Sequence, residues 1–321
     1  MACNKADAIL SIGKNGRTGN KLAQVTKAVF FAAATNMTCV HLEPKSYNNS
    51  LLAMPEYLRL GKHSIKGDGC TSASSESWLH RCGASSVVCG NFWLNGCHGV
   101  AAGDLRPLAE AYIKPYARFS TAEGFPRGDN LLTAHLRGGD LLKESRNGYA
   151  NHWMWAQPPC AVYERIVNHG NYSAILVVLD KPVEAHPCVP WFRNFSKHRG
   201  LKLRIQSSSV VEDARAIYRA RNLALSYSTF GESIALVSGE AKRLYVYNTF
   251  QEHSAMNCKL WPGVSLYGIL GPNKPPARNN TLAALWAHMT TYKDVAGPVF
   301  VTDDLCKRGS EGEWALVFGN S

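Results

Sequence analysis

Apolar and polar positions alternate along the chain in the segments expected of an α/β protein. Residues 8–12 predict a short buried strand, residues 13–19 a glycine-rich turn, and residues 20–36 a helix. The apolar face of that helix comprises Leu22, Val25, Val29 and Ala33. A second strand is predicted at 38–42. A strand, a turn, a helix and a strand in this order open an α/β domain with a parallel sheet.

The part of the chain that follows is less regular. Residues 43–83 are rich in Ser, Gly and Pro and predict long surface excursions. A strand is predicted at 85–89, and a helix at 104–116 with proline in its first turn and near its end. The segment Phe125-Pro-Arg-Gly-Asp129 has the composition of a joint between domains.

A regular alternation resumes after this joint. We expect strands at 131–136, 175–179, 201–206, 223–226 and 244–247, and helices at 159–168, 189–197, 211–221 and from about 229. Strands separated by helices of roughly 10 residues predict a doubly wound sheet. We therefore predict two Rossmann-type α/β domains, 1–128 and 129–321, that face one another across a cleft. The tail is a candidate to pack back on the first domain.

The composition is that of a folded globular chain. Of 321 residues, 45% are apolar and 18% charged, which excludes a disordered or fibrous protein. The longest apolar run near the N-terminus, 28–34, is far shorter than the roughly 20 residues of a membrane-spanning helix. Thirty-five basic and 24 acidic side chains give a net charge of +11, scattered without a run of five basic residues. This favours a solvated basic surface over a nucleic-acid site and keeps phosphate-bearing small molecules as candidate partners.

Ten cysteines, an even number, favour disulfides. None forms a C-x-x-C pair, and the Cys70–Cys97 cluster beside His98 has spacings too wide for a zinc site. Cys39 and Cys160 lie near apolar stretches, where buried thiols are the alternative to disulfides.

The cysteines are accompanied by five N-glycosylation sequons, at Asn36, Asn48, Asn171, Asn194 and Asn279. Together they favour the lumen of the secretory pathway, because both modifications are made there. The N-terminus carries no apolar signal segment. We therefore expect a luminal chain whose N-terminal membrane anchor is missing from this sequence, with a cytosolic protein as the alternative.

Three segments stand out because each of them ends a predicted strand. They are Gly16-Arg-Thr-Gly-Asn20, His135-Leu-Arg-Gly-Gly-Asp140 and Asn222-Leu-Ala-Leu-Ser-Tyr-Ser-Thr-Phe230. In open α/β sheets, ligands bind beyond the carboxyl ends of the strands, where helix N-termini present N–H groups. The segments are therefore candidates for a ligand site.

The middle segment carries the most distinctive chemistry. Arg137 offers a planar fork suited to a diphosphate, and Gly138 and Gly139 leave room for one. Asp140 is interpreted as a structural residue that orients the loop or caps a helix. The alternative for the pair is an internal Arg137–Asp140 ion pair.

The outer segments have ordinary structural alternatives. The loop 16–20 lacks the Walker A and complete G-x-G-x-x-G patterns and is compatible with a plain strand-to-helix turn. Ser228 and Thr229 can bind phosphate oxygens, or they can cap a helix.

In their order, the three segments resemble the GDP-fucose-dependent fucosyltransferase superfamily, which includes α1,2- and α1,6-fucosyltransferases and protein O-fucosyltransferases. Its members carry a G-x-x-G-N loop, an H-x-R-x-G-D loop and an S-T-F element at a helix start, and the matches here span roughly residues 8–250. The resemblance implies a GT-B-like fold, GDP-fucose as the donor, a glycan or glycoprotein acceptor, and the Golgi lumen.

The resemblance also implies a role for each matching residue. Arg137 would hold the β-phosphate of the departing GDP as the catalytic group, and His135 would lie at the nucleoside. Asp213 stands where family members keep an acid that binds guanine. The other donor-binding residues would be Gly19, Asn20, Ser228, Thr229 and Phe230.

The reaction type follows from the motifs that the chain has and lacks. No D-x-D motif occurs, which favours a transferase without metal or cofactor. The family resemblance implies inversion at the anomeric carbon. Lys21 replaces the Gln usual in the family, and Gly138 stands where many relatives have a second Arg. The general base is not assigned, and Glu43, Asp68 and Glu144 are candidates.

Two alternatives to this function are the same fold acting on another nucleotide sugar and a non-catalytic glycan-binding relative. The intact Arg137 and Ser228-Thr229 argue against the second. The remaining aromatic candidates, Trp153 and Trp155, either pack the domain joint or stack on a sugar. Histidines 41, 152, 186, 253 and 288 show no ligand spacing and are assigned core or surface roles.

Overall fold

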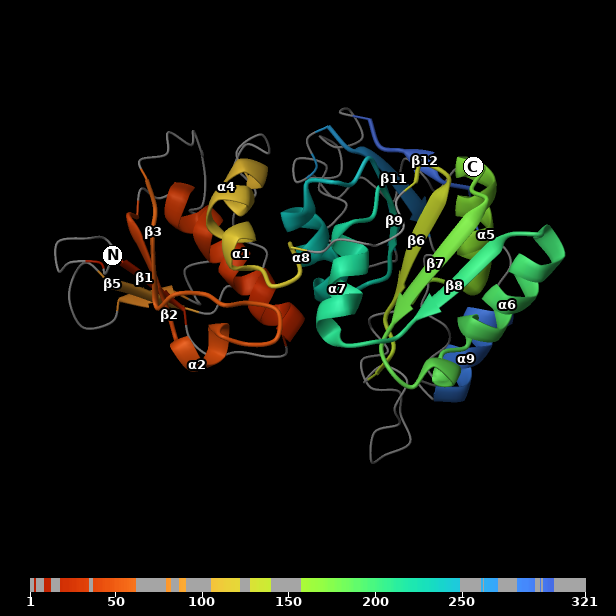
Figure 1. Cartoon of the computed structure of the whole chain (residues 1–321), viewed down its shortest axis with the longest axis horizontal. Coiled ribbons are helices and arrows are strands. Elements are labelled where there is room, and N and C mark those ends of the chain that lie inside the picture. Colours follow the sequence, from red (N-terminus) through yellow and green to blue (C-terminus); the bar gives the residue numbers. More distant parts are fainter. Residues whose placement is uncertain are drawn as a thin grey trace. The chain divides into compact units, whose positions relative to one another are not determined.

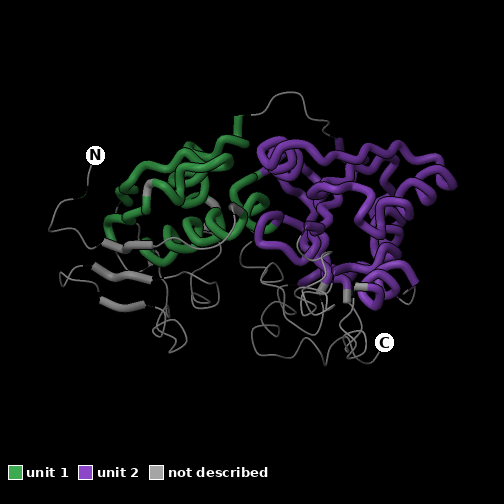
Figure 2. Tube along the Cα trace, turned by 90° about the horizontal axis from the view of Figure 1, so that it is seen from below, with its two compact units in different colours: residues 1–123, 232–239, 259–262 green, residues 124–231, 240–258, 263–321 purple. Residues whose placement is uncertain are grey.

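Two compact units make up the chain (Figure 2). Unit 1 comprises residues 1–123, 232–239 and 259–262, and unit 2 comprises residues 124–231, 240–258 and 263–321. The computed structural model describes residues 3, 9–12, 18–34, 37–61, 79–81, 87–90, 105–121, 128–139, 157–248, 261, 263–270, 282–291, 295 and 297–302.

Unit 1 is built on a five-stranded sheet with the order β3-β2-β1-β5-β4. Its strands are β1 (Ile9–Ile12), β2 (Cys39–Leu42), β3 (Tyr57–Arg59), β4 (Leu79–Arg81) and β5 (Val87–Gly90). The strand β1 is parallel to both β2 and β5, whereas β3 and β4 join the edges antiparallel. The predicted parallel opening is confirmed. The stretch 43–83, expected to be irregular, contains β3, β4 and the four-residue helix α2 (Pro44–Tyr47).

The helices of unit 1 are α1 (Thr18–Ala34) and α4 (Leu105–Tyr112), followed by the 3-10 turn η2 (Lys114–Tyr116). All four apolar residues of the predicted α1 face are buried, and most of the other side chains of α1 are buried too. The expected helix 104–116 ends as an α-helix at Tyr112. Pro115 follows, and proline lacks the N–H that a continuing helix needs.

Unit 2 is built on a seven-stranded sheet with the order β8-β7-β6-β9-β10-β11-β12. Its strands are β6 (Leu131–Leu136), β7 (Ala174–Leu179), β8 (Lys202–Gln206), β9 (Asn222–Leu225), β10 (Arg243–Asn248), β11 (Ser265–Leu270) and β12 (Val299–Phe300). All neighbours pair in parallel except β11 and β12. Numbered within the unit, the six parallel strands have the Rossmann order 3-2-1-4-5-6. The predicted mixed α/β fold class is confirmed. The facing of the two domains across a cleft stays a prediction.

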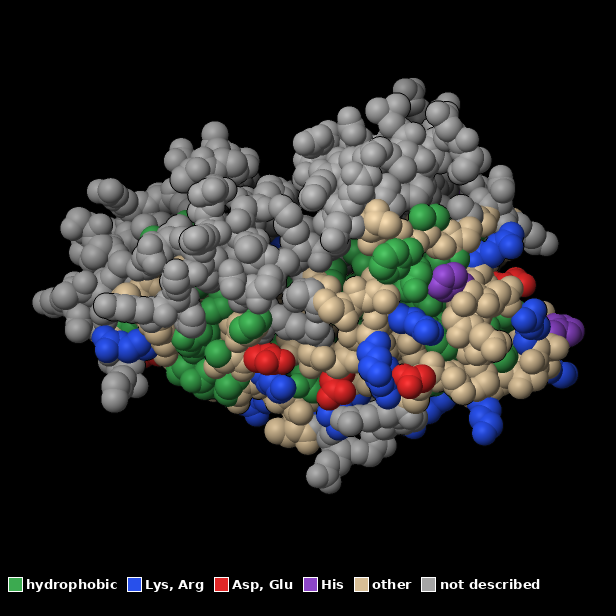
Figure 3. All heavy atoms as spheres, turned by 90° about the horizontal axis from the view of Figure 1, so that it is seen from above, with side chains coloured by type: hydrophobic (Ala, Val, Ile, Leu, Met, Phe, Trp, Pro, Cys, Tyr) green, Lys and Arg blue, Asp and Glu red, His purple; other side chains and the backbone are tan. Residues whose placement is uncertain are grey.

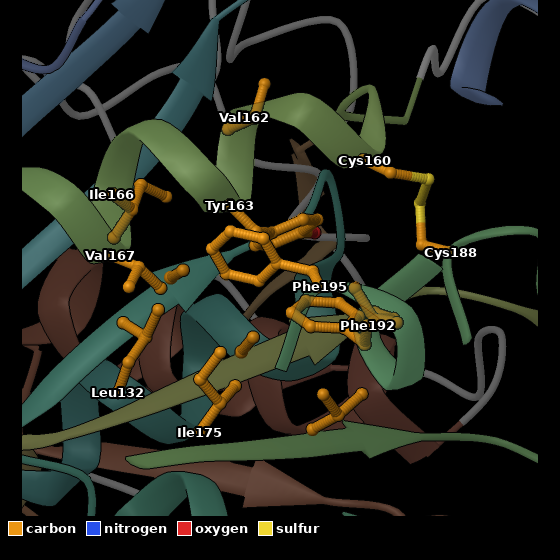
Figure 4. Close-up of a cluster of buried hydrophobic side chains, with 14 of the residues drawn as sticks. Leu132, Cys160, Val162, Tyr163, Ile166, Val167, Ile175, Cys188, Phe192 and Phe195 are labelled. Atoms are coloured by element: carbon orange, nitrogen blue, oxygen red, sulfur yellow. A yellow bond between two sulfur atoms is a disulfide. The ribbon is translucent and has the colours of Figure 1, made fainter. Parts of the chain in front are cut away.

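Helices cover both faces of this sheet, with α5, α6 and α9 on one side and α7 on the other (Figure 1). These helices are α5 (Cys160–Gly170), α6 (Cys188–Arg199), α7 (Val210–Tyr218) and α9 (Leu282–Thr291). A further helix, α8 (Thr229–Ser238), begins in unit 2, and its residues from Glu232 onward belong to unit 1. Between the sheet and α5 and α6, Leu132 and Ile175 pack beneath Tyr163 and Phe192 (Figure 4). The apolar residues of the inner strands β6, β7 and β9 are buried on both faces apart from the first residues of β6 and β7, as a doubly wound sheet requires.

The described part of the tail adds to unit 2 rather than to the first domain. Beyond β10, where the predicted series ended, β11 extends the sheet, α9 packs against α5 and α6, and β12 closes the edge. β11 is difficult to predict, because Gly268 interrupts its apolar run and glycine weakens a strand pattern.

Two disulfides lie in the described part of the chain, Cys3–Cys39 and Cys160–Cys188. The alternative of buried thiols at Cys39 and Cys160 is therefore wrong, although both residues are buried as expected. The second disulfide joins the first residue of α5 to the first residue of α6 at the end of the core (Figure 4). Buried disulfides favour an oxidising compartment.

Surface charge agrees with the scattered basic pattern of the sequence. On the face drawn in Figure 3, the Lys and Arg side chains of the described residues are interspersed with acidic and uncharged ones. Among the helices that the structure describes, none is long and apolar enough to cross a bilayer.

Candidate functional site

The candidate site lies at the carboxyl ends of β6 and β9 in unit 2. These two strands are adjacent and parallel, with His135 opposite Leu225. They are the first and fourth strands of the unit, so the strand order reverses between them. Ligands of doubly wound sheets bind outside the carboxyl ends at such a reversal. The second and third sequence segments both emerge there.

Arg137 links the two loops that leave these strands. Its Nη1 donates a hydrogen bond to the backbone carbonyl of Tyr227 at 3.1 Å. The N–H of Ser226 donates to the carbonyl of His135 at 3.2 Å and so continues the strand pairing past β9. The guanidinium is therefore held at the reversal point by the loop that leads into α8.

His135 is a buried, neutral member of the site. Burial lowers its pKa to about 3, and the positive charge of Arg137 and the nearby His186 act in the same direction. Its Nδ1 lies 3.2 Å from Oγ of Ser226, and its ring centroid lies 5.8 Å from that of Phe230. Because the ring is uncharged at physiological pH, it can form hydrogen bonds with a ligand but cannot neutralise the negative charge of a phosphate.

The start of α8 completes this side of the site. Oγ of Ser228 accepts a hydrogen bond from the N–H of Phe230 at 3.3 Å, which is the behaviour of a helix cap. The capping interpretation of Ser228 is thus confirmed. A phosphate-binding role for the helix start is compatible with it, because a helix N-terminus carries partial positive charge.

Gly231 is a site residue that the sequence analysis missed. A Cβ at this position would lie 2.6 Å from Nδ1 of His135 and 2.9 Å from Cδ2 of Leu225. Only glycine lets the first turn of α8 approach the imidazole so closely. Its position directly after Ser-Thr-Phe was the available signal.

Asp180, at the end of β7, also escaped the sequence analysis. Gly139 has a φ of +62°, and a Cβ there would lie 2.8 Å from Oδ2 of Asp180. Gly139 is therefore favoured by its backbone conformation. The expectation that it leaves room for a diphosphate stays a prediction. Asp140, the expected partner of Arg137, lies outside the described residues.

Asp213 reaches the same edge of the sheet, in the first turn of α7 after β8. Its Oδ1 accepts hydrogen bonds from Nε2 of Gln206 at 3.2 Å and from the N–H of Ser208 at 3.1 Å. Burial raises the pKa of this carboxyl, as do the carboxylates of Asp180 and Glu212, while the two hydrogen bonds oppose the rise. The carboxylates of Asp180 and Asp213, which follow neighbouring strands, are thus close enough to interact electrostatically.

The expected site residues of unit 1 lie on a helix rather than in a loop. Gly19 and Asn20 belong to the first turn of α1, which begins at Thr18. Glu43, a candidate base, lies just before α2, and its carboxylate accepts a hydrogen bond from Oγ of Ser46 at 2.6 Å. That contact gives Glu43 a local structural role. The other candidates on which the sequence analysis drew, Asp68, Glu144, Trp153 and Trp155, lie outside the described residues.

Metal ligands were not expected at the site. In the part of the chain that the structure describes, no group of three or more His, Cys, Asp or Glu side chains is arranged to hold a metal ion. Metal independence itself stays a prediction, to be tested with a chelator.

Comparison with known proteins gives a likeness in structure and none in sequence. No protein-family model matches the chain, and no curated protein matches it in sequence. Among solved structures, the chain is similar to POFUT1 in complex with GDP-fucose, with a TM-score of 0.39 and 12% identity. The likeness covers 75% of this chain and 96% of that one. Similarity at this level carries no information about what the chain binds.

Proposed function

We propose that this chain is a glycosyltransferase that binds a nucleotide sugar at the carboxyl ends of β6 and β9. From the resemblance of its three segments, the donor is GDP-fucose and the acceptor a glycan or glycoprotein. The observation that carries the proposal is the hydrogen bond from Arg137 to Tyr227. It holds a guanidinium beside a helix N-terminus at the strand reversal of a Rossmann sheet.

The chemistry follows from where charge develops. When the bond between the sugar C1 and the β-phosphate oxygen breaks, its electron pair stays on GDP and the sugar gains oxocarbenium character. The acceptor hydroxyl attacks C1 from the opposite face, so the configuration inverts, and its proton passes to a base that is not assigned. Arg137 and the N-terminus of α8 stabilise the departing diphosphate. They do what a divalent cation does in metal-dependent transferases.

The nucleoside end of the donor is assigned to His135 and Asp213. A neutral imidazole can hydrogen-bond the nucleoside without attracting the phosphates away from Arg137. Oδ1 of Asp213 already accepts two hydrogen bonds from the chain, so Oδ2 is the atom that would accept from guanine N–H groups. Phe230 would line the base pocket, and Gly19 and Asn20 would approach the donor from the other domain.

The compartment proposed for the reaction is the Golgi lumen. The buried Cys160–Cys188 disulfide supports an oxidising compartment.

A donor-turnover assay tests the proposal. The chain is incubated with GDP-fucose, GDP-mannose, UDP-galactose or CMP-sialic acid in EDTA, and release of the nucleotide is measured with and without a mixture of glycan acceptors. Acceptor-stimulated release of GDP from GDP-fucose alone supports the proposal. Release from another donor would support the same fold with a different nucleotide sugar, and no release would contradict the enzymatic function.

A further inference from the structure

Ser226 contacts His135 twice, once through its backbone and once through its side chain. It follows β9 directly and is 1% exposed. Its N–H donates to the carbonyl of His135 at 3.2 Å, and its Oγ lies 3.2 Å from Nδ1 of the same residue. The first bond extends the pairing of β6 with β9. The second is a contact between side chains to which neither the sequence motifs nor the proposed mechanism gives a role.

The His135 ring is enclosed on the side of Nδ1. A Cβ on Gly231 would lie 2.6 Å from Nδ1 and 3.2 Å from Cε1, so the first turn of α8 lies directly against this edge of the imidazole. Nδ1 is therefore occupied by Ser226 and covered by α8. In the part of the chain that the structure describes, Nε2 forms no hydrogen bond. It is the ring nitrogen that remains for a ligand.

The contact with Ser226 decides which ring nitrogen carries the proton. The ring is neutral at physiological pH, because burial lowers its pKa to about 3, and so it holds a single proton. If that proton were on Nδ1, it would bond to Oγ of Ser226, and the hydroxyl proton would need another acceptor. Among the described residues, His135 is the only partner of this Oγ.

A buried hydroxyl proton without an acceptor is unfavourable, since it has lost its bond to water and gained none. The arrangement that satisfies both protons has the Ser226 hydroxyl donating to Nδ1. The ring proton then lies on Nε2, since the bond at one nitrogen of a neutral imidazole sets the protonation of the other. His135 thus offers a donor, rather than a lone pair, to a ligand at the carboxyl edge of the sheet.

We propose that Ser226 is a positioning residue for His135, which fixes the imidazole so that its Nε2–H donates to an acceptor atom of the donor's nucleoside. The proposal rests on the proposed nucleotide-sugar function. It requires the hydroxyl of Ser226, not merely a small side chain that fits beside the ring.

Two substitutions of Ser226 and one control separate these possibilities. Ser226→Ala removes the hydroxyl at nearly unchanged volume, and Ser226→Thr keeps it. Ser196→Ala, in α6, is the matched control, because Ser196 is equally buried and its Oγ has no hydrogen-bond partner among the described residues. Ser196 completes the sequon at Asn194, so all proteins are produced without glycans.

The first measurement is nitrogen NMR of protein labelled in its histidine rings, which needs no ligand. The His135 signals are assigned by their absence in His135→Gln. We expect a protonated Nε2 and an unprotonated, hydrogen-bonded Nδ1 in the wild type. The Nδ1 resonance should move in Ser226→Ala, where the bond is lost, and return in Ser226→Thr. A wild-type ring protonated on Nδ1, or an Nδ1 resonance indifferent to Ser226→Ala, overturns the proposal.

The second measurement is calorimetric binding of GDP to the same proteins. Ser226→Ala should bind about tenfold more weakly than the wild type, the effect of one lost hydrogen bond, whereas Ser226→Thr and Ser196→Ala should bind as the wild type does. If Ser226→Thr fails to fold, the comparison of Ser226→Ala with Ser196→Ala decides alone. Unchanged affinity in Ser226→Ala would overturn the positioning role. If the wild type binds no GDP, the proposed function fails, and the NMR comparison still decides whether Ser226 donates to His135.

Discussion

The backbone carbonyl of Tyr227 accepts a hydrogen bond from Nη1 of Arg137 at 3.1 Å, across 90 positions of the sequence. Because the two residues follow β6 and β9, the bond joins the loops on either side of the strand reversal in unit 2. A substitution in either loop should therefore affect the other. His135 and Gly231, one at the end of β6 and the other in α8, lie close together. A substitution of Gly231 is therefore a simple way to test this coupling.

Gly231→Ala should disturb the site from within. The added Cβ would lie 2.6 Å from Nδ1 of His135, so the ring and its contact with Ser226 must shift. We expect a loss of about 1–3 kcal/mol of stability, as for other overpacked interiors, together with weaker GDP binding. Chemical unfolding and calorimetry measure the two effects.

Gly297→Ala is the matched control for this substitution. A Cβ at position 297 meets no atom within 4 Å, so stability and GDP binding should stay at wild-type values. If Gly231→Ala behaved like this control, the close packing of α8 on His135 would be refuted.

Stability should fall as the pH drops below neutral. His135 and His186 have pKa values of about 3 and about 4 in the folded chain, whereas an unfolded histidine has a pKa of about 6.5. The unfolded chain therefore binds more protons below about pH 6.5, and stability is lost as the pH falls from there toward 4. Each of the two histidines should shift the unfolding equilibrium roughly tenfold per pH unit in this window.

The variant His186→Gln measures how much of this pH-dependent loss of stability comes from one histidine. Denaturant unfolding followed between about pH 7 and pH 5 should show a shallower loss of stability in this variant than in the wild type. Identical pH dependence of the two proteins would mean that His186 is not buried in its neutral form.

Removal of the Cys160–Cys188 disulfide should destabilise unit 2. The bond closes a loop with a sequence separation of 28, for which chain entropy predicts a contribution of about 3 to 4 kcal/mol. We expect the double variant Cys160→Ala/Cys188→Ala to lose that much in denaturant unfolding. Reductant is a poorer test, because it also opens Cys3–Cys39. Labelling of Cys160 and Cys188 by a thiol reagent in the native protein would show that the bond is absent.

The doubly wound sheet of unit 2 could be predicted from the sequence for a physical reason. Its inner strands are buried on both faces, so they contain continuous apolar runs such as Ile175–Leu179, separated by helices of regular length. The edge strands β3 and β12 escaped prediction because, with three and two residues, they are too short to show a periodic pattern. The disulfide partner of Cys160 could not be found either, because pairing depends on the fold.

The candidate site could be predicted only in part. Arg137, His135 and Ser228 carry motif chemistry that is visible in the sequence, and the structure brings all three to one edge of the sheet. Asp180, by contrast, lies beside Gly139 in the loop after β6 without belonging to any motif. Contacts of this kind leave no pattern in the sequence, because many side chains can surround a given loop.

The account rests on Arg137 as the group that binds the donor diphosphate. Calorimetric titration of GDP, UDP, CDP and ADP in EDTA, against the wild type, Arg137→Ala and the exposed control Arg204→Ala, tests it most directly. We predict selective GDP binding by the wild type and by Arg204→Ala. Affinity should fall by about ten- to a hundredfold in Arg137→Ala, the effect of a lost charged hydrogen bond. Equal binding of all four nucleotides, or GDP binding that is indifferent to Arg137, would contradict the account.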